Sequence, residues 1–318
     1  MKKFLTLLTV FFCFYSGISA QQPSKIPHLE IPAITSKDVI IKHKAYTLSY
    51  NEKSEQANWV AYELTEVETH KTVKRSNDFC PDNAVPTGSA TNADYQGSGY
   101  DRGHMAPAAD MSWSVQTMQE SFYYSNMSPQ VPGFNRGIWK KLEEQVRQWA
   151  VENQDIYVVT GPVLSGNLST IGPDRVSVPK YYYKVILDDT LPGLKGIGFI
   201  MPNASSTMPL QSFAVSIDSV EKVTGINFFP ALPEQEEQAL EKSVCLSCWS
   251  WTSTSTRHQS PESTALRPSP RGEAVSDNWR RSGVRSQCTA ITHSGTRCKR
   301  MTTHPSGLCT QHEKQASF

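Results

Sequence analysis

The chain has 318 residues, and its 31 Lys and Arg nearly balance its 30 Asp and Glu. The charge is unevenly placed: residues 251–318 hold ten basic and four acidic residues, whereas residues 21–250 hold 19 basic and 26 acidic ones. An acidic body excludes a protein that reads DNA sequence with high affinity, because phosphate contacts dominate such binding. An enzyme that must release its product needs only a local basic groove.

The N-terminus carries a targeting pattern. Lys2 and Lys3 precede the apolar run 4–15, and small residues follow up to Ala20. This pattern predicts a signal peptide over residues 1–20, and the apolar run is shorter than the roughly 20 residues that span a bilayer. We therefore expect a secreted or periplasmic protein with no stable membrane association after cleavage.

The body of the chain mixes strand and helix patterns. Residues 21–41 are rich in Pro and polar residues and predict an N-terminal extension, and residues 77–100 predict a long irregular segment. Aromatic and β-branched runs predict strands at 46–50, 58–64, 122–125, 156–160, 181–187 and 196–201. The interleaving lacks regular βαβ spacing, which favours an α+β fold.

Two helices are expected. In residues 137–151, Ile138, Leu142, Val146 and Trp149 recur at helical spacing and predict one buried face. A second, shorter helix is expected at 216–223.

Residues 101–144 contain the parts needed for phosphodiester hydrolysis, which are a base for water and a hard cation at the phosphate. The run Asp101-Arg102-Gly103-His104 places a carboxylate, a guanidinium and an imidazole together, with Gly103 expected to permit an unusual backbone angle. Downstream, Asn126, Asn135 and Glu143 offer oxygen atoms, and Asn135, Trp139 and Glu143 share one face if the helix begins near Asn135.

Each of these residues also has a structural interpretation. A histidine beside an arginine is more often structural, an asparagine before a helix is often its N-cap, and a helical glutamate is usually solvated. Residue types and spacing alone therefore favour a hydrolase site only slightly.

Several ordered motifs point to a family. Residues 101–107 (DRGHMAP), 125–130 (SNMSPQ), 134–139 (FNRGIW) and 142–143 (LE) resemble the DNA/RNA non-specific endonuclease family, which includes Serratia-type nucleases and endonuclease G. The resemblance spans residues 42–249. It implies the ββα-metal nuclease fold, with a central antiparallel sheet flanked by helices.

The resemblance also implies roles for individual residues. His104 matches the general base, Asn135 the single protein ligand of the metal, and Glu143 the acid that holds metal-bound water. Arg102 and Asn126 match residues that brace the site and substrate, and Arg75 matches an upstream arginine that meets the phosphate.

One position departs from the family pattern. Some members carry an asparagine four residues before Asn126, where this chain has Phe122. Position 122 therefore supports no catalytic role.

The expected metal is Mg²⁺, with Mn²⁺ as the second candidate. A single neutral asparagine oxygen leaves most of the octahedron to water and phosphate oxygens, which suits Mg²⁺, whereas soft ligands would have indicated zinc.

Six cysteines remain after residue 20. Cys245-x-x-Cys248 is compatible with half of a metal site, a redox pair or disulfides, and in a secreted chain we favour disulfides, with a link from Cys80 to one of the two as one pairing.

Near the C-terminus, Cys288, Cys298, Cys309 and His312 form a candidate structural Zn²⁺ set. A basic, partly disulfide-bonded tail is the equal alternative. The expected organisation is a catalytic domain at 42–250, a basic disordered linker at 251–286 and a small Cys/His module at 287–318.

The sequence thus predicts a secreted, Mg²⁺-dependent endonuclease that hydrolyses DNA and RNA with little sequence preference. The alternatives are a catalytically inactive nucleic-acid-binding protein on the same scaffold and a phosphodiesterase for small or lipid substrates.

Overall fold

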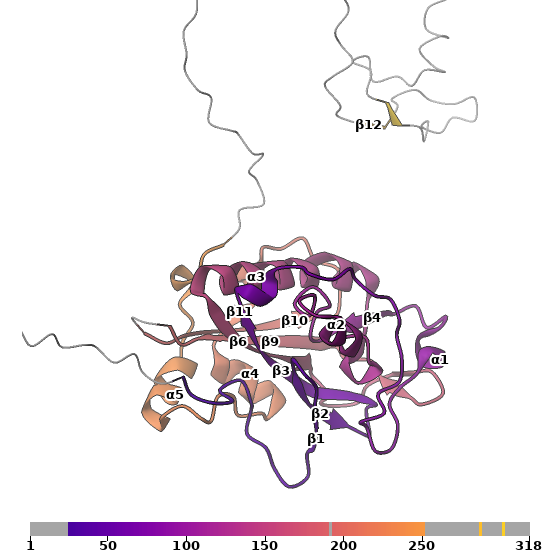
Figure 1. Cartoon of the computed structure of the whole chain (residues 1–318), viewed down its shortest axis with the longest axis horizontal. Coiled ribbons are helices and arrows are strands. Elements are labelled where there is room, and N and C mark those ends of the chain that lie inside the picture. The colour runs from indigo at the N-terminus through magenta and orange to yellow at the C-terminus, as the bar shows by residue number, and fades with distance from the viewer. Residues whose placement is uncertain (1–24, 191–192, 252–285, 288–300, 303–318) are drawn as a thin grey trace, which may run out of the picture. The chain divides into compact units, whose positions relative to one another are not determined.

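The structure, a computed structural model, describes residues 25–190 and 193–251 and two short strands at 286–287 and 301–302. Its centre is one antiparallel sheet with the order β1-β2-β3-β6-β9-β10-β11 (Figure 1). The strands are β1 (Val39–Lys42), β2 (Thr47–Asn51), β3 (Gln56–Thr65), β6 (Asp155–Pro162), β9 (Tyr181–Asp188), β10 (Lys195–Pro202) and β11 (Ala214–Val215).

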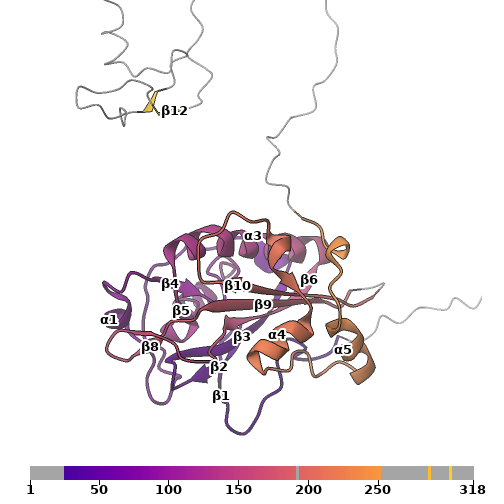
Figure 2. The same cartoon turned by 180° about the vertical axis from the view of Figure 1, so that it is seen from behind.

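Helices cover both faces of this sheet. Helix α3 (Lys140–Asn153) lies along one face, while α4 (Ile217–Thr224) and α5 (Glu234–Glu241) lie on the other, as Figure 1 and the reverse view in Figure 2 both show. Because side chains alternate along a strand, Tyr62 of β3 packs in the core under α3 and Trp59 of the same strand packs in the core under α4.

Smaller elements surround the sheet. The helices are α1 (Asn92–Tyr95) and α2 (Val115–Glu120), and the two-stranded sheets are β4 (Asp101–His104) with β5 (Met127–Gln130) and β7 (Thr170–Ile171) with β8 (Val176–Ser177). Short 3-10 turns lie at Val67–Thr69, Tyr124–Asn126, Leu210–Phe213 and Leu246–Cys248, and a π-helical turn lies at Phe134–Trp139.

The α+β class, the antiparallel sheet and the flanking helices are confirmed. Five of the six expected strands are present within a few residues of their expected bounds. The strand expected at 122–125 is wrong: the Asn126 amide donates to the Tyr123 carbonyl in a 3-10 turn, and the strand follows at Met127.

The long helix also differs from its expected start. Gly137 has φ −107° and ψ −109°, which no helix accommodates, so regular α-helix begins only at Lys140. Asn135 therefore precedes a kink in the chain. It does not share one face of a continuous helix with Trp139 and Glu143.

The N-terminal extension was expected at residues 21–41. From residue 25, where the described structure begins, this segment packs on the domain. Leu29 is fully buried in the core under α4, and the Ala33 amide donates to the carbonyl of Asn227 at 3.0 Å. Strand β1 then begins at Val39 and pairs with β2.

Several expectations fall outside the described residues. They are the signal peptide at 1–20, nearly all of the linker at 251–286 and the side chains of Cys288, Cys298, Cys309 and His312. In a second unit, Ser255–Phe318, the strands β12 (Ser286–Gln287) and β13 (Met301–Thr302) pair antiparallel. No helix in the described part of the chain has both the length and the apolar character to cross a bilayer.

Candidate active site

The motif Asp101–His104 forms strand β4, which pairs antiparallel with β5 so that His104 lies opposite Met127. Gly103 is required here for a reason other than the one expected. Its φ is not positive; instead, a Cβ at this position would lie 2.3 Å from Cδ of Gln130. The expectation of an unusual backbone angle is wrong, and a side chain at this position would require the side chain of Gln130 to move.

His104 is enclosed by aromatic rings. Only 7% of the residue is exposed, with Phe122 edge-on at 4.8 Å between centroids and Phe79 at 5.8 Å. Burial, together with the positive charge of Arg75, lowers the pKa of His104 to about 3. A hydrogen bond with the Arg102 backbone opposes this shift because it raises the pKa. The imidazole is therefore neutral at physiological pH.

The tautomer of His104 follows from its contacts. Its Nε2 is buried without a hydrogen-bond partner, so the bond to the Arg102 backbone belongs to Nδ1. A ring that donates from Nδ1 presents a lone pair at Nε2, which is the form a general base needs.

Asn126 lies behind His104 and is fully buried. Its Oδ1 accepts from the Ala106 amide at 2.8 Å, and its Nδ2 donates to the carbonyls of Ala106 and Ser121, both at 2.9 Å. These bonds fix the chain that leaves β4. The side chain of Asn126 thus holds the backbone after β4 and is fully buried.

Asn135 is tied to the catalytic strand through Asp101. The Nδ2 of Asn135 donates to Oδ2 of Asp101 at 2.9 Å, and Arg136 holds the same carboxylate from Nε at 2.7 Å. Because a carboxylate accepts only from the amide nitrogen, this bond orients the amide and leaves Oδ1 of Asn135 available. Asp101 thus orients the amide of the expected metal ligand.

Glu143 lies in the first turn of α3 and is half-buried. Burial raises its pKa, while the charge of Lys184 opposes this rise most strongly. Lys184 extends from β9, is fully buried and has no hydrogen-bond partner at Nζ, which lies 4.9 Å from the centroid of the Trp139 ring. Burial lowers the pKa of Lys184, and Glu143 opposes this shift.

A second buried pair adjoins these charges. Asp110 is fully buried, accepts from Nη1 of Arg147 at 2.7 Å and accepts from the hydroxyl of Tyr62 at 2.9 Å. Sequence reasoning missed Lys184, Asp110 and Arg147. For Lys184 the signal was present, since it is the only charged residue in the run Tyr181–Leu187.

The two expected arginines lie over the aromatic rings that contact His104. Arg102 donates from Nε to the hydroxyl of Tyr124 at 3.0 Å, hydrogen-bonds Asn92 and lies over the Phe79 ring. Arg75 is exposed, and its guanidinium lies 5.0 Å from the centroid of the Phe122 ring. Both cations thus flank the rings that enclose the imidazole.

Asn135 and Glu143 form a donor set that fits a hard cation. Asn135 and Glu143 offer amide and carboxylate oxygens, and Asn135 Oδ1 has no hydrogen-bond partner within the described residues. Oxygen donors suit Mg²⁺ or Mn²⁺.

The cysteine expectations are resolved for three residues. Cys245 and Cys248 form a disulfide with each other, which confirms disulfide bonding there. The link from Cys80 is wrong, because Cys80 is a free thiol. Residues 245 and 248 are close in sequence, so their pairing closes a turn at the end of the domain.

Comparison with known proteins identifies the family. Residues 28–235 match the family model for DNA/RNA non-specific endonuclease. The chain belongs to this family. The match begins before the boundary expected at residue 42, in agreement with the packing of Leu29.

Individual relatives agree with this assignment. The chain is 39% identical over 218 residues to nuclease C1 of Cunninghamella echinulata var. echinulata, covering 62% of this chain and 85% of the relative. It is 34% identical over 224 residues to mitochondrial endonuclease G of Bos taurus, covering 65% and 74%. A crystal structure of the EndoG/EndoGI complex matches with a TM-score of 0.62 at 34% identity, covering 68% of this chain and 96% of that chain.

Proposed function

We propose that this protein is a secreted, Mg²⁺-dependent endonuclease that hydrolyses phosphodiester bonds in DNA and RNA with little sequence preference. One observation carries the proposal: a neutral His104 with a free Nε2 shares strand β4 with Asp101, which orients the oxygen donor Asn135. Strand β4 thus connects the candidate general base, His104, with the candidate oxygen ligand of a hard cation, Asn135.

The proposed chemistry assigns one task to each group. His104 Nε2 takes a proton from the attacking water, and the ring remains oriented by its bond to the Arg102 backbone. Asn135 would hold the metal ion and Glu143 the water bound to it; the ion when bound supplies positive charge for the phosphate and the departing oxygen. Arg75 adds a cation beside His104.

Low sequence preference follows from the same groups. The catalytic groups would act on phosphate oxygens and water, which carry no base information. The signal-peptide pattern in residues 2–20 supports secretion.

The test is an incubation of the purified full chain with plasmid DNA and with total RNA, in Mg²⁺ and in EDTA. Wild type should degrade both only with Mg²⁺, and His104→Ala should be slower by about 10²–10⁴-fold, the usual contribution of a general base. Equal cutting by His104→Ala would remove the base assignment. Binding without any cleavage would instead support the inactive nucleic-acid-binding protein.

A further inference from the structure

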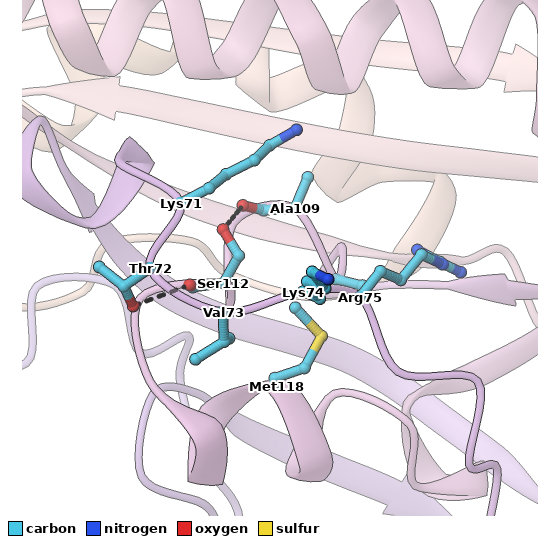
Figure 3. Close-up of a pocket in the computed structure, with 9 residues that line it drawn as sticks. Lys71, Thr72, Val73, Lys74, Arg75, Ala109, Ser112 and Met118 are labelled. Atoms are coloured by element: carbon cyan, nitrogen blue, oxygen red, sulfur yellow. Dashed lines mark hydrogen bonds between the residues drawn. The ribbon is translucent and has the colours of Figure 1, made fainter.

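A pocket of about 420 Å³ lies beside the proposed catalytic centre (Figure 3). One wall is the segment 71–75, which we call the strap. The other walls come from residues 108–112 after strand β4 and from helix α2, from which Met118 enters the pocket. Residues that are distant in sequence therefore form one concave surface.

Hydrogen bonds fix the strap against the opposite wall. The backbone amides of Thr72 and Val73 both donate to the Ser112 carbonyl at 3.0 Å, and the Thr72 hydroxyl donates to the same oxygen at 3.2 Å. The Ser112 hydroxyl in turn donates to the Ala109 carbonyl at 2.9 Å. The pocket is thus built before any ligand arrives.

The pocket has an apolar floor and a cationic rim. Val73, Ala108 and Met118 supply the apolar surface, and Lys71, Lys74 and Arg75 supply the charge; no carboxylate lines the pocket. Within the described residues, Lys71 and Lys74 are exposed and form neither an ion pair nor a side-chain hydrogen bond. Their charges are therefore available to an anionic ligand.

The pocket adjoins the proposed catalytic centre. Arg75 lines it and also lies over the Phe122 ring, which contacts His104 edge-on at 4.8 Å. Phe122 also packs with Ala108 and Met118 of the floor. One aromatic ring therefore separates the pocket from the imidazole.

We propose that the strap pocket binds the nucleotide next to the scissile bond of a polynucleotide strand, with Lys71 and Lys74 holding its non-reacting phosphodiester. Val73, Ala108 and Met118 contact the sugar and base of that nucleotide. This inference rests on the proposed function, since it places the substrate strand relative to His104. It requires a ligand that combines an anionic linkage with an apolar ring, which polynucleotides offer at every residue.

The first test compares two substrates. A dinucleoside monophosphate contains only the scissile phosphodiester, whereas a hexanucleotide also offers a neighbouring one. The double variant Lys71→Ala/Lys74→Ala should lose about tenfold in kcat/KM on the hexanucleotide, from two lost phosphate contacts, and nothing on the dinucleoside monophosphate. The control Lys53→Ala/Lys222→Ala removes the same charge from exposed sites away from the pocket and should match wild type on both.

Equal losses on both substrates, or no loss on the hexanucleotide, would overturn the proposal. A binding measurement separates this result from failure of the proposed function. In EDTA and a His104→Ala background, we measure the affinity for a labelled single-stranded 12-mer against salt concentration. Removing both lysines should reduce the slope of log K against log salt by about 0.7, the value for one phosphate that is no longer neutralised. An unchanged slope rejects the strap pocket even if the enzyme cuts DNA, and a reduced slope supports it even if it does not.

Discussion

The two faces of the central sheet are built from the same strands but differ in charge. On β9, the side chains of Tyr183, Val185 and Leu187 pack in the apolar core under α4. On the opposite side of the same strand, Lys184 stands between Tyr182 and Ile186, toward Trp139 and the core under α3.

The face under α3 therefore contains buried charges that a stability argument alone does not explain. Lys184 and Asp110 are fully buried and Arg147 is half-buried, at a cost in desolvation that an apolar core would avoid. Glu143 lies among them and is also the candidate for holding metal-bound water. The face under α4 stabilises the fold, whereas the face under α3 also sets the charge of the catalytic groups.

Among the variants that test this difference between the two faces, the largest loss of activity is expected for Asn135→Ala. Asn135→Ala removes the oriented amide oxygen, so activity should fall by about 10²–10³-fold at low Mg²⁺ and recover partly as Mg²⁺ is raised. Asn167→Ala, an exposed asparagine in a loop, is the matched control and should match wild type. A Mg²⁺ dependence identical to that of wild type would remove Asn135 as the ligand.

The face under α4 should affect stability alone. Ile217 of α4 is 1% exposed in the core, and Ile217→Ala should lower the free energy of unfolding by about 3 kcal/mol. Urea unfolding measures this loss. At 25 °C the folded variant should keep its kcat/KM, and a large loss of turnover would show that both faces serve catalysis.

His104 should make stability depend on pH. The folded imidazole stays neutral down to a pKa of about 3, while the unfolded chain takes up a proton below its ordinary pKa of about 6.5. The unfolded state then binds more protons, so stability is lost as pH falls through this window. Between pH 6.5 and 5, wild type should lose about 1.6 kcal/mol more than His104→Asn. Parallel unfolding curves for the two proteins would contradict a buried neutral histidine.

The smallest expected effect concerns Lys184. Lys184→Met removes a cation that opposes the raised pKa of Glu143, so that pKa should rise further. The acid limb of the pH profile of kcat/KM should move up by about one pH unit. Lys180→Met removes an exposed lysine nearby and should leave the profile in place. An unmoved limb in Lys184→Met would mean that Lys184 does not act on Glu143.

Much of the fold was predictable from local patterns. The runs at 156–160 and 181–187 became β6 and β9 because continuous apolar and β-branched residues suit a strand buried on both faces. The error at 122–125 arose because Phe122 packs beside His104 and not in the sheet, which a strand pattern cannot distinguish.

The site was predicted less completely than the fold. The ordered motifs selected His104, Asn135 and Glu143, and the structure places these on β4, before the kink and in the first turn of α3. The orienting role of Asp101 was not visible, because its bond to Asn135 joins residues 34 positions apart.

The sequence by itself determined the family, the α+β class and the identity of the chemical groups, because these depend on residue types in a fixed order. Only the tertiary structure decided their chemical state. Burial among Phe79 and Phe122 keeps the imidazole of His104 neutral. The charge of Lys184 acts on Glu143 only because β9 packs beneath α3. Charge and pKa depend on three-dimensional surroundings, and those surroundings are assembled from distant parts of the chain.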